Sequence, residues 1–216
     1  MEPFSWRLVT VDIDGTLTLV HGWYEIALAF GRLPEYEASN RRFFAHEEGE
    51  DEHLADLLDL ATGRTVEEVR EVVARTPKLA GIGEGIAELR GRGARVALLT
   101  HNPSYVVEYY QRTFGFDDAE GVDAQTTDGG RIGAPRDVRA DKPGGLERLL
   151  ARAGVDPRAT VHVGDGWSDA EVFRLVGGGV ALNSRLAEVE RAADRVVRSR
   201  DFRDVVEALT TLRPRA

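Results

Sequence analysis

Short apolar runs alternate with helix-like apolar spacings along most of this chain. The runs read as buried strands, and the segments between them carry apolar residues three and four positions apart, as amphipathic helices do. We expect strands at 8–11, 95–100, near 122, at 160–163, 179–182 and 195–197. Strands that alternate with helices predict an α/β fold with a doubly wound, mostly parallel sheet.

One long stretch after the first strand lacks strand signals. Apolar positions over 23–30 fit one helix face, and Thr65 with Glu68 forms a capping-box pattern that opens another helix. We therefore expect a small helical domain at 18–78, inserted into a core formed by 1–17 and 79–216. Later in the chain, Gly129 and Gly130 predict a hairpin or flap within 125–136.

Composition narrows the classes of function. The 216 residues carry a net charge of −9, which argues against sequence-independent nucleic-acid binding and against adhesion to an anionic membrane. Cysteine is absent, and no apolar run is long enough to span a membrane. The polar start, Met1 to Trp6, is too short for a signal peptide. We expect a cytoplasmic protein, and the sequence makes no prediction of its oligomeric state.

Polar residues of catalytic type follow several of the expected strands. Asp12 and Asp14 end the first strand, and paired carboxylates can bind a hard divalent cation or divide the roles of nucleophile and acid/base. Each residue alone has an ordinary explanation as a turn, a cap or a surface group. Their joint occurrence at strand ends and helix starts is much harder to explain that way. The full set is Asp12, Asp14, Thr100, Lys142, Asp165 and Asp169.

The order of these residues resembles the haloacid dehalogenase (HAD) superfamily of phosphohydrolases. Asp12-Ile13-Asp14-Gly15-Thr16 matches its first motif, Thr100 the second, Lys142 the third and Gly164 to Asp169 the fourth. The helical insertion directly after the first motif is similar to the cap of the phosphoserine-phosphatase-like branch. The superfamily therefore implies a Rossmann-like core that acts on a small phosphorylated metabolite.

The resemblance implies a role for each motif residue. Asp12 attacks phosphorus and becomes an aspartyl phosphate, and Asp14 acts as general acid and then general base. Thr100 donates to a phosphoryl oxygen, and Lys142 neutralises charge. The implied Mg²⁺ ligands are the Asp12 carboxylate, the Asp14 backbone carbonyl and Asp165, with Asp169 either a direct ligand or a support through water. The substrate-side residues are Gly15, Thr16, His21, His101 and Asn102.

The chain departs from that branch at several positions. His21 aligns with the glutamate that meets the ammonium of phosphoserine, and an imidazole cannot replace an anion there. The arginine for the substrate carboxylate has no counterpart in 56–60. The second motif reads Thr100-His101-Asn102 instead of Ser-Gly-Gly, and we expect Asn102 to cap the helix that follows. Trp167, which is bulkier than usual, either lines the leaving-group pocket or packs the next helix.

These observations predict a Mg²⁺-dependent phosphomonoester hydrolase with an aspartyl-phosphate intermediate and a small organic substrate other than phosphoserine. A phosphoserine phosphatase and a phosphotransferase of the same superfamily are the alternatives. A phospho-accepting signalling domain is a remote alternative. Such receivers carry the phosphorylated aspartate after a middle strand, whereas Asp12 ends the first.

Overall fold

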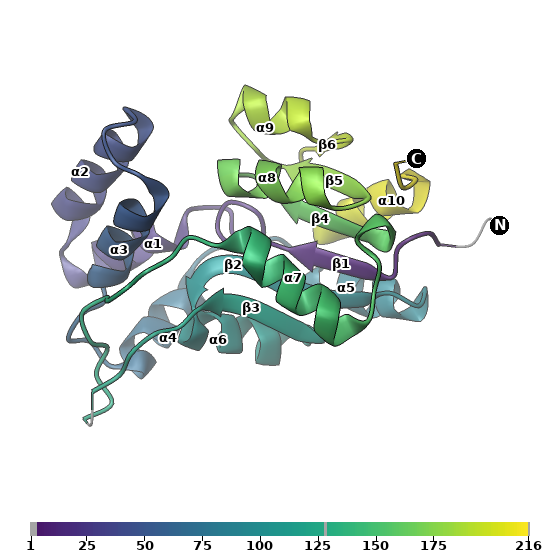
Figure 1. Ribbon diagram of the computed structural model, residues 1–216. Helices are drawn as coiled ribbons and strands as arrows, with labels where there is room; N and C mark the ends of the chain where they lie inside the picture. The colour runs from purple at the N-terminus through teal and green to yellow at the C-terminus, as the bar shows by residue number, and fades with distance from the viewer. Residues whose placement is uncertain (1–3, 128, 216) are drawn as a thin grey trace.

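A single parallel sheet organises the computed structural model of the protein, which describes residues 4–127 and 129–215. The strand order is β3-β2-β1-β4-β5-β6, and every neighbouring pair is parallel (Figure 1). The strands are β1 (Leu8–Val11), β2 (Arg95–Pro103), β3 (Asp118–Val122), β4 (Thr160–Gly164), β5 (Gly178–Leu182) and β6 (Arg195–Val197). The predicted α/β fold with a parallel sheet is confirmed.

The strand register places the end of β1 between β2, which continues to Pro103, and β4, which ends at Gly164. Val11, the last residue of β1, pairs with Leu98 of β2 on one side and with Val163 of β4 on the other. The chain runs outward from β1 in one direction through β2 and β3, and in the other through β4 to β6. Ligands of such sheets bind beyond the carboxyl ends of the strands at this reversal point. The polar residues that follow β1 and β4 therefore share one crevice.

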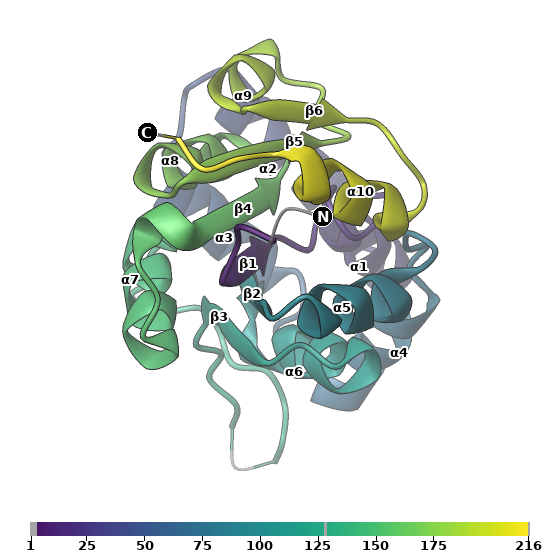
Figure 2. The same cartoon turned by 90° about the vertical axis from the view of Figure 1, so that its right-hand side faces the viewer.

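Helices cover both faces of the sheet (Figure 2). One face carries α5 (Ile82–Gly91), α6 (Ser104–Phe114) and α10 (Phe202–Thr211), and the other carries α7 (Lys142–Ala153) and α8 (Trp167–Leu175). The short helices η1 (Pro157–Ala159) and α9 (Ala187–Ala192) complete the core. Because both faces are covered, the strands next to the crevice are buried and have near-continuous apolar sequences.

Four helices separate β1 from α5 and lie beyond the carboxyl ends of the strands (Figure 1). They are α1 (Gly22–Phe30), α2 (Leu33–Phe44), α3 (Glu50–Asp59) and α4 (Val66–Arg75). The capping box that opens α4 is present, since the side chains of Thr65 and Glu68 each accept a hydrogen bond from the other residue's backbone N–H. Sequence analysis did not predict α2, because its sequence LPEYEASNRRFF contains a single fully buried residue, Ser39.

The two passages between these helices and the core run side by side. Leu19 N–H donates to the Pro77 carbonyl and Leu79 N–H to the Leu17 carbonyl, both at 2.9 Å. This narrow neck supports a division at 18–78, although the domain boundaries themselves stay a prediction.

A hairpin from the core also reaches the cap helices. Thr126 and Ile132 form an antiparallel bridge within the predicted 125–136 segment, of which Asp128 lies outside the described residues. Ile132 in turn exchanges backbone hydrogen bonds with the α3–α4 connection, at 2.8 Å to Gly63 N–H and 2.7 Å to the Arg64 carbonyl. The cap is therefore held to the core by the hairpin as well as by the neck.

In the part of the chain that the structure describes, no helix has the length and apolar character needed to cross a membrane. The predictions of a cytoplasmic location and of no contact with membranes or nucleic acids extend beyond this finding and stay predictions.

Candidate active site

A cavity of about 270 Å³ lies between the cap helices and the carboxyl ends of β1, β2 and β4. Most of the predicted site residues line it: Asp12, Asp14, His21, Thr100, His101, Asn102, Lys142, Asp165 and Asp169. Gly15 and Thr16 do not; they lie behind Asp165. The Thr16 hydroxyl donates to Asp165 Oδ1 at 2.8 Å, and a Cβ on Gly15, whose φ is +79°, would lie 2.3 Å from Asp165 Oδ2.

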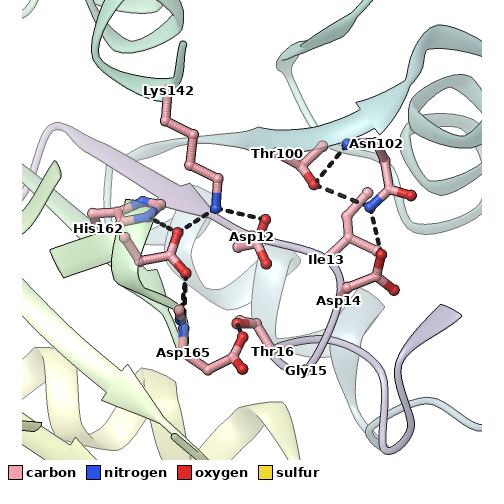
Figure 3. Close-up of polar contacts among 12 residues, drawn as sticks. Asp12, Ile13, Asp14, Gly15, Thr16, Thr100, Asn102, Lys142, His162 and Asp165 are labelled. Carbon is pink, nitrogen blue, oxygen red and sulfur yellow. Dashed lines mark hydrogen bonds and ion pairs between the residues drawn. The ribbon is translucent and has the colours of Figure 1, made fainter. Parts of the chain in front are cut away.

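The ammonium of Lys142 joins two carboxylates at the floor of the cavity (Figure 3). Its Nζ donates to Asp12 Oδ1 at 3.0 Å and to Asp169 Oδ1, and all three side chains are buried. Burial alone would lower the pKa of Lys142, but the two carboxylates hold it above its ordinary value. Lys142 therefore stays charged and fixes the Asp12 carboxylate at the end of β1.

Three carboxylates crowd around this single ammonium. Oxygens of Asp12, Asp165 and Asp169 lie within 4.8 Å of one another. Burial and the neighbouring carboxylates raise the pKa of Asp12 to about 6 and that of Asp165 well above its usual value, even though Lys142 opposes the shift. A divalent cation would relieve this like-charge crowding, and carboxylate oxygens are the donors that Mg²⁺ prefers. The donor set therefore fits the predicted metal.

Asp169 is already engaged on both of its oxygens. Oδ1 accepts from Lys142, and Oδ2 accepts the backbone N–H groups of Asp165 and Gly166, each at 2.9 Å. Burial would raise the pKa of Asp169, but Lys142 and the imidazole of His162 hold it low. Direct coordination of a metal would compete with these bonds. The sequence left open whether Asp169 ligates the metal directly or supports it through water. These contacts fit support through water better.

His162 is a site residue that sequence reasoning missed. It lies within β4, fully buried, with Nε2 2.9 Å from Asp169 Oδ1 and Nδ1 2.8 Å from the Thr10 hydroxyl of β1. The hydroxyl can donate to Nδ1, which leaves the Nε2 hydrogen for Asp169. The available signal was the polar residue itself, in the middle of the apolar run at 160–163.

Asp14 is held from two sides. Gly22 N–H at the start of α1 donates to Oδ1 at 2.7 Å. The Asn102 amide donates to Oδ2 at 2.9 Å (Figure 3). The prediction that Asn102 caps the next helix is wrong. The N-cap of α6 is Pro103, β2 continues through Asn102, and its side chain turns to Asp14. Gly22 was also missed, although glycine at a helix start is a readable signal of close backbone approach.

Gly22→Ala should disturb Asp14 with little effect on the fold. A Cβ at this position would lie 2.5 Å from Asp14 Oδ1, so the carboxylate must move, whereas alanine suits a helix. We expect kcat/KM for phenyl phosphate to fall by roughly tenfold or more, about 1.4 kcal/mol of transition-state stabilisation. Gly83→Ala in α5, where an added Cβ meets nothing within 4 Å, is the control. Full activity of Gly22→Ala would contradict the contact.

His101 lines the same cavity, and its buried imidazole is neutral. Burial and the nearby Lys142 charge lower the pKa of its imidazole to about 3, and its Nε2 has no hydrogen-bond partner among the described residues. A neutral ring with a free nitrogen can accept or donate one hydrogen bond to a bound ligand. This arrangement is compatible with its predicted place near the substrate.

The cap side of the cavity is largely aromatic. The Trp167 ring, at the start of α8, lies 5.5 Å from both Phe43 and Phe44 of α2, so it packs across the cap–core junction. It also lines the cavity, and both roles considered for it from sequence therefore apply. Phe43 stacks on His53 at 4.3 Å.

Residues 6–177 match the haloacid dehalogenase-like hydrolase family. The chain belongs to this family. The resemblance predicted from four short motifs is thereby confirmed over most of the HAD core.

Curated relatives of this HAD hydrolase include phosphoserine phosphatases. That of Archaeoglobus fulgidus is 28% identical over 86% of this chain, and that of Methanocaldococcus jannaschii is 26% identical over 93%. The chain spans 56% of the length of the first and 96% of the second.

Solved structures agree on the fold of this HAD hydrolase. A phosphoserine phosphatase solved as a phospho-aspartyl intermediate analogue has a TM-score of 0.80 and 24% identity, covering 94% of this chain and 98% of its own. A substrate-bound phosphoserine phosphatase complex gives the same TM-score and coverage at 23% identity. At these identities the likeness shows that the HAD core with a helical insert after β1 is shared.

Proposed function

We propose that this HAD hydrolase is a Mg²⁺-dependent phosphatase that cleaves a small organic phosphomonoester through an aspartyl-phosphate intermediate on Asp12. The observation that carries the proposal is the buried Lys142 ammonium, 3.0 Å from Asp12 at the floor of a cavity that Asp14 and Asp165 also line. A carboxylate that is held beside a cation at the carboxyl edge of a parallel sheet is suited to in-line attack on phosphorus.

The first half-reaction transfers the phosphoryl group to the protein. An oxygen of Asp12 forms a bond to phosphorus as the bond from phosphorus to the ester oxygen breaks. Asp14 gives its proton to the departing alkoxide. Lys142 and the Thr100 hydroxyl balance charge on the phosphoryl oxygens. Bound Mg²⁺, held by Asp12, Asp165 and the Asp14 carbonyl with Asp169 in support, would add positive charge at the phosphoryl group.

The second half-reaction returns Asp12 to its starting state. Asp14, now ionised, takes a proton from water as the water oxygen attacks phosphorus, and the acyl phosphate bond to Asp12 breaks. Inorganic phosphate leaves, and Asp14 is protonated again. An alcohol in place of water would make the protein a phosphotransferase. Product analysis with and without candidate acceptor alcohols separates these two outcomes.

Two substrate classes compete. The curated relatives that match most of the chain include phosphoserine phosphatases, whereas phosphoglycolate phosphatases match about a third of it. The comparisons therefore support phosphoserine better than they support the different organic phosphate expected from sequence. The cavity supports the other class. His21 lies on its wall, and no arginine is among the described residues that line it. Among those residues, Glu50 is the one carboxylate that the cap contributes to the cavity wall. The ammonium of phosphoserine would have to reach Glu50 to pair with an anion of the cap.

His21→Glu should raise the preference for L-phosphoserine. The new carboxylate would face the substrate ammonium. For this exposed position we expect the ratio of kcat/KM for L-phosphoserine to that for 3-phosphoglycerate to rise up to about fivefold. Leu28→Glu, with the same charge change on an exposed position of α1, should leave the ratio unchanged. If the unmodified protein already prefers L-phosphoserine over the whole panel, the role given to His21 is wrong.

The proposed function is tested by assaying the purified protein against a panel of phosphomonoesters with Mg²⁺ and again after chelation with EDTA. The panel contains L-phosphoserine, 3-phosphoglycerate, sugar phosphates and two aryl phosphates. Turnover that depends on Mg²⁺ supports the proposal. A protein that is folded but releases no phosphate from any member of the panel would refute it.

A further inference from the structure

We propose that Asn102 is a positioning residue whose one side-chain amide orients both the phosphate-binding hydroxyl of Thr100 and the acid/base carboxyl of Asp14. The inference rests on the proposed function and adds a residue to its mechanism. Asn102 stands in the second motif, where the phosphoserine-phosphatase-like branch has glycine. Its side chain does not cap α6, whose N-cap is Pro103.

The Asn102 amide uses both of its hydrogens on the two catalytic groups. Nδ2 lies 3.1 Å from Thr100 Oγ1 and 2.9 Å from Asp14 Oδ2 (Figure 3). A primary amide nitrogen has two hydrogens, and each of these contacts takes one. Asn102 is 5% exposed; its bond to Thr100 is buried and its bond to Asp14 is partly buried.

The hydrogen bonds to Thr100 also fix where its own hydrogen can point. Oγ1 accepts the Asn102 backbone N–H at 3.3 Å in addition to Nδ2. With two N–H donors on the oxygen, the hydroxyl hydrogen must point elsewhere, and no group in 4–127 or 129–215 accepts it. Thr100 lines the cavity, so this hydrogen is available to a phosphoryl oxygen.

Asp14 is fixed between two separate elements. Gly22 N–H holds Oδ1 from the start of α1, and Asn102 holds Oδ2 from the end of β2. A carboxyl group with a donor on each oxygen has its plane set, which a general acid needs if its proton is to reach one leaving oxygen. Without the amide, Gly22 alone would leave the carboxyl free to turn about its remaining bond.

The test compares two aryl phosphates of similar shape. p-Nitrophenolate leaves with little need for a proton, whereas phenolate is more basic and depends more on the general acid. For Asn102→Ala we expect kcat/KM to fall about threefold to tenfold for p-nitrophenyl phosphate, through Thr100. For phenyl phosphate the loss should be roughly tenfold larger still, through Asp14. A residue that merely supported the fold would lower both values equally.

Variants of Thr100 and Asp14 show what loss of each group alone does to the two substrates. Thr100→Val should lower kcat/KM for the two substrates by the same factor, and Asp14→Asn should lower it far more for phenyl phosphate. In the Asp14→Asn background, Asn102→Ala should add no further difference between the substrates, because the group it positions is gone. Asn102→Asp keeps the shape but faces Asp14 with a second carboxylate, so its loss on phenyl phosphate should exceed that of Asn102→Ala.

The outcomes distinguish failure of the positioning role of Asn102 from failure of the proposed function. Equal losses on both substrates for Asn102→Ala and Asn102→Asp, in protein that is folded by circular dichroism, overturn the positioning role and leave the proposed function standing. Absence of Mg²⁺-dependent turnover of either ester by the unmodified protein overturns the proposed function, and the inference falls with it.

Discussion

Asp12→Asn is expected to abolish Mg²⁺-dependent hydrolysis of p-nitrophenyl phosphate, with a loss of at least roughly a thousandfold in kcat. An amide is a poor nucleophile toward phosphorus, so the first half-reaction has no acceptor. The side chain keeps its size, and the fold should survive, because Lys142 retains Asp169 as a buried partner.

Steady-state turnover and labelling check this result together. The unmodified protein should incorporate phosphate from a labelled ester in an acid-stable, hydroxylamine-sensitive form, as an acyl phosphate does, and Asp12→Asn should incorporate none. Asp204→Asn, on the exposed side of α10, is the matched control for the loss of one carboxylate. Near-normal turnover by folded Asp12→Asn would exclude the mechanism.

Lys142→Arg is the second change with a large expected effect. Lys142 is 3% exposed and fits between Asp12 and Asp169, where a planar guanidinium is too large to replace a compact ammonium. Arginine would displace one carboxylate, and displacement of Asp12 would misplace the nucleophile. We expect kcat/KM to fall at least about tenfold, or 1.4 kcal/mol.

The chain supplies a matched control for this substitution. Its only other lysine, Lys78, binds backbone carbonyls at the end of α4, among them that of Thr76 at 2.8 Å, and does not line the cavity. Lys78→Arg should leave kcat/KM unchanged. An unchanged rate for Lys142→Arg as well would mean that the ammonium does not act on the reacting groups.

The sequence predicted the site residues that come directly after the expected strands. Apolar runs located β1 and β4, and a parallel sheet brings the residues after them together, so Asp12 and Asp165 could be placed beside each other. The contacts of His162 and Gly22 could not be predicted in this way. Each depends on a partner fixed by tertiary packing, and periodicity contains no information about which atoms meet.

Errors in the predicted elements have similar causes. The α2 helix was not predicted because residues 33–44 present a mostly polar surface, and its position depends on contacts with α1 and α3. For Asn102, the local preference of asparagine for helix caps was outweighed by two other side-chain hydrogen bonds. One goes to Asp14, which is distant in the chain, and the other is a buried bond to Thr100. Local propensity is a weak guide where a buried amide has stronger partners.

The attachment of the 125–136 hairpin to the α3–α4 connection bears on how the cavity exchanges its contents with water. Rotation of the cap about the neck alone would break the backbone bonds between Ile132 and the residues Gly63 and Arg64. If the cap moves to admit substrate, either those bonds break or the hairpin moves with the cap as one rigid unit. In the second case the hinge includes the two ends of the hairpin as well as the two passages of the neck. The rate of product escape would then depend on a segment that contributes no atom to the reaction.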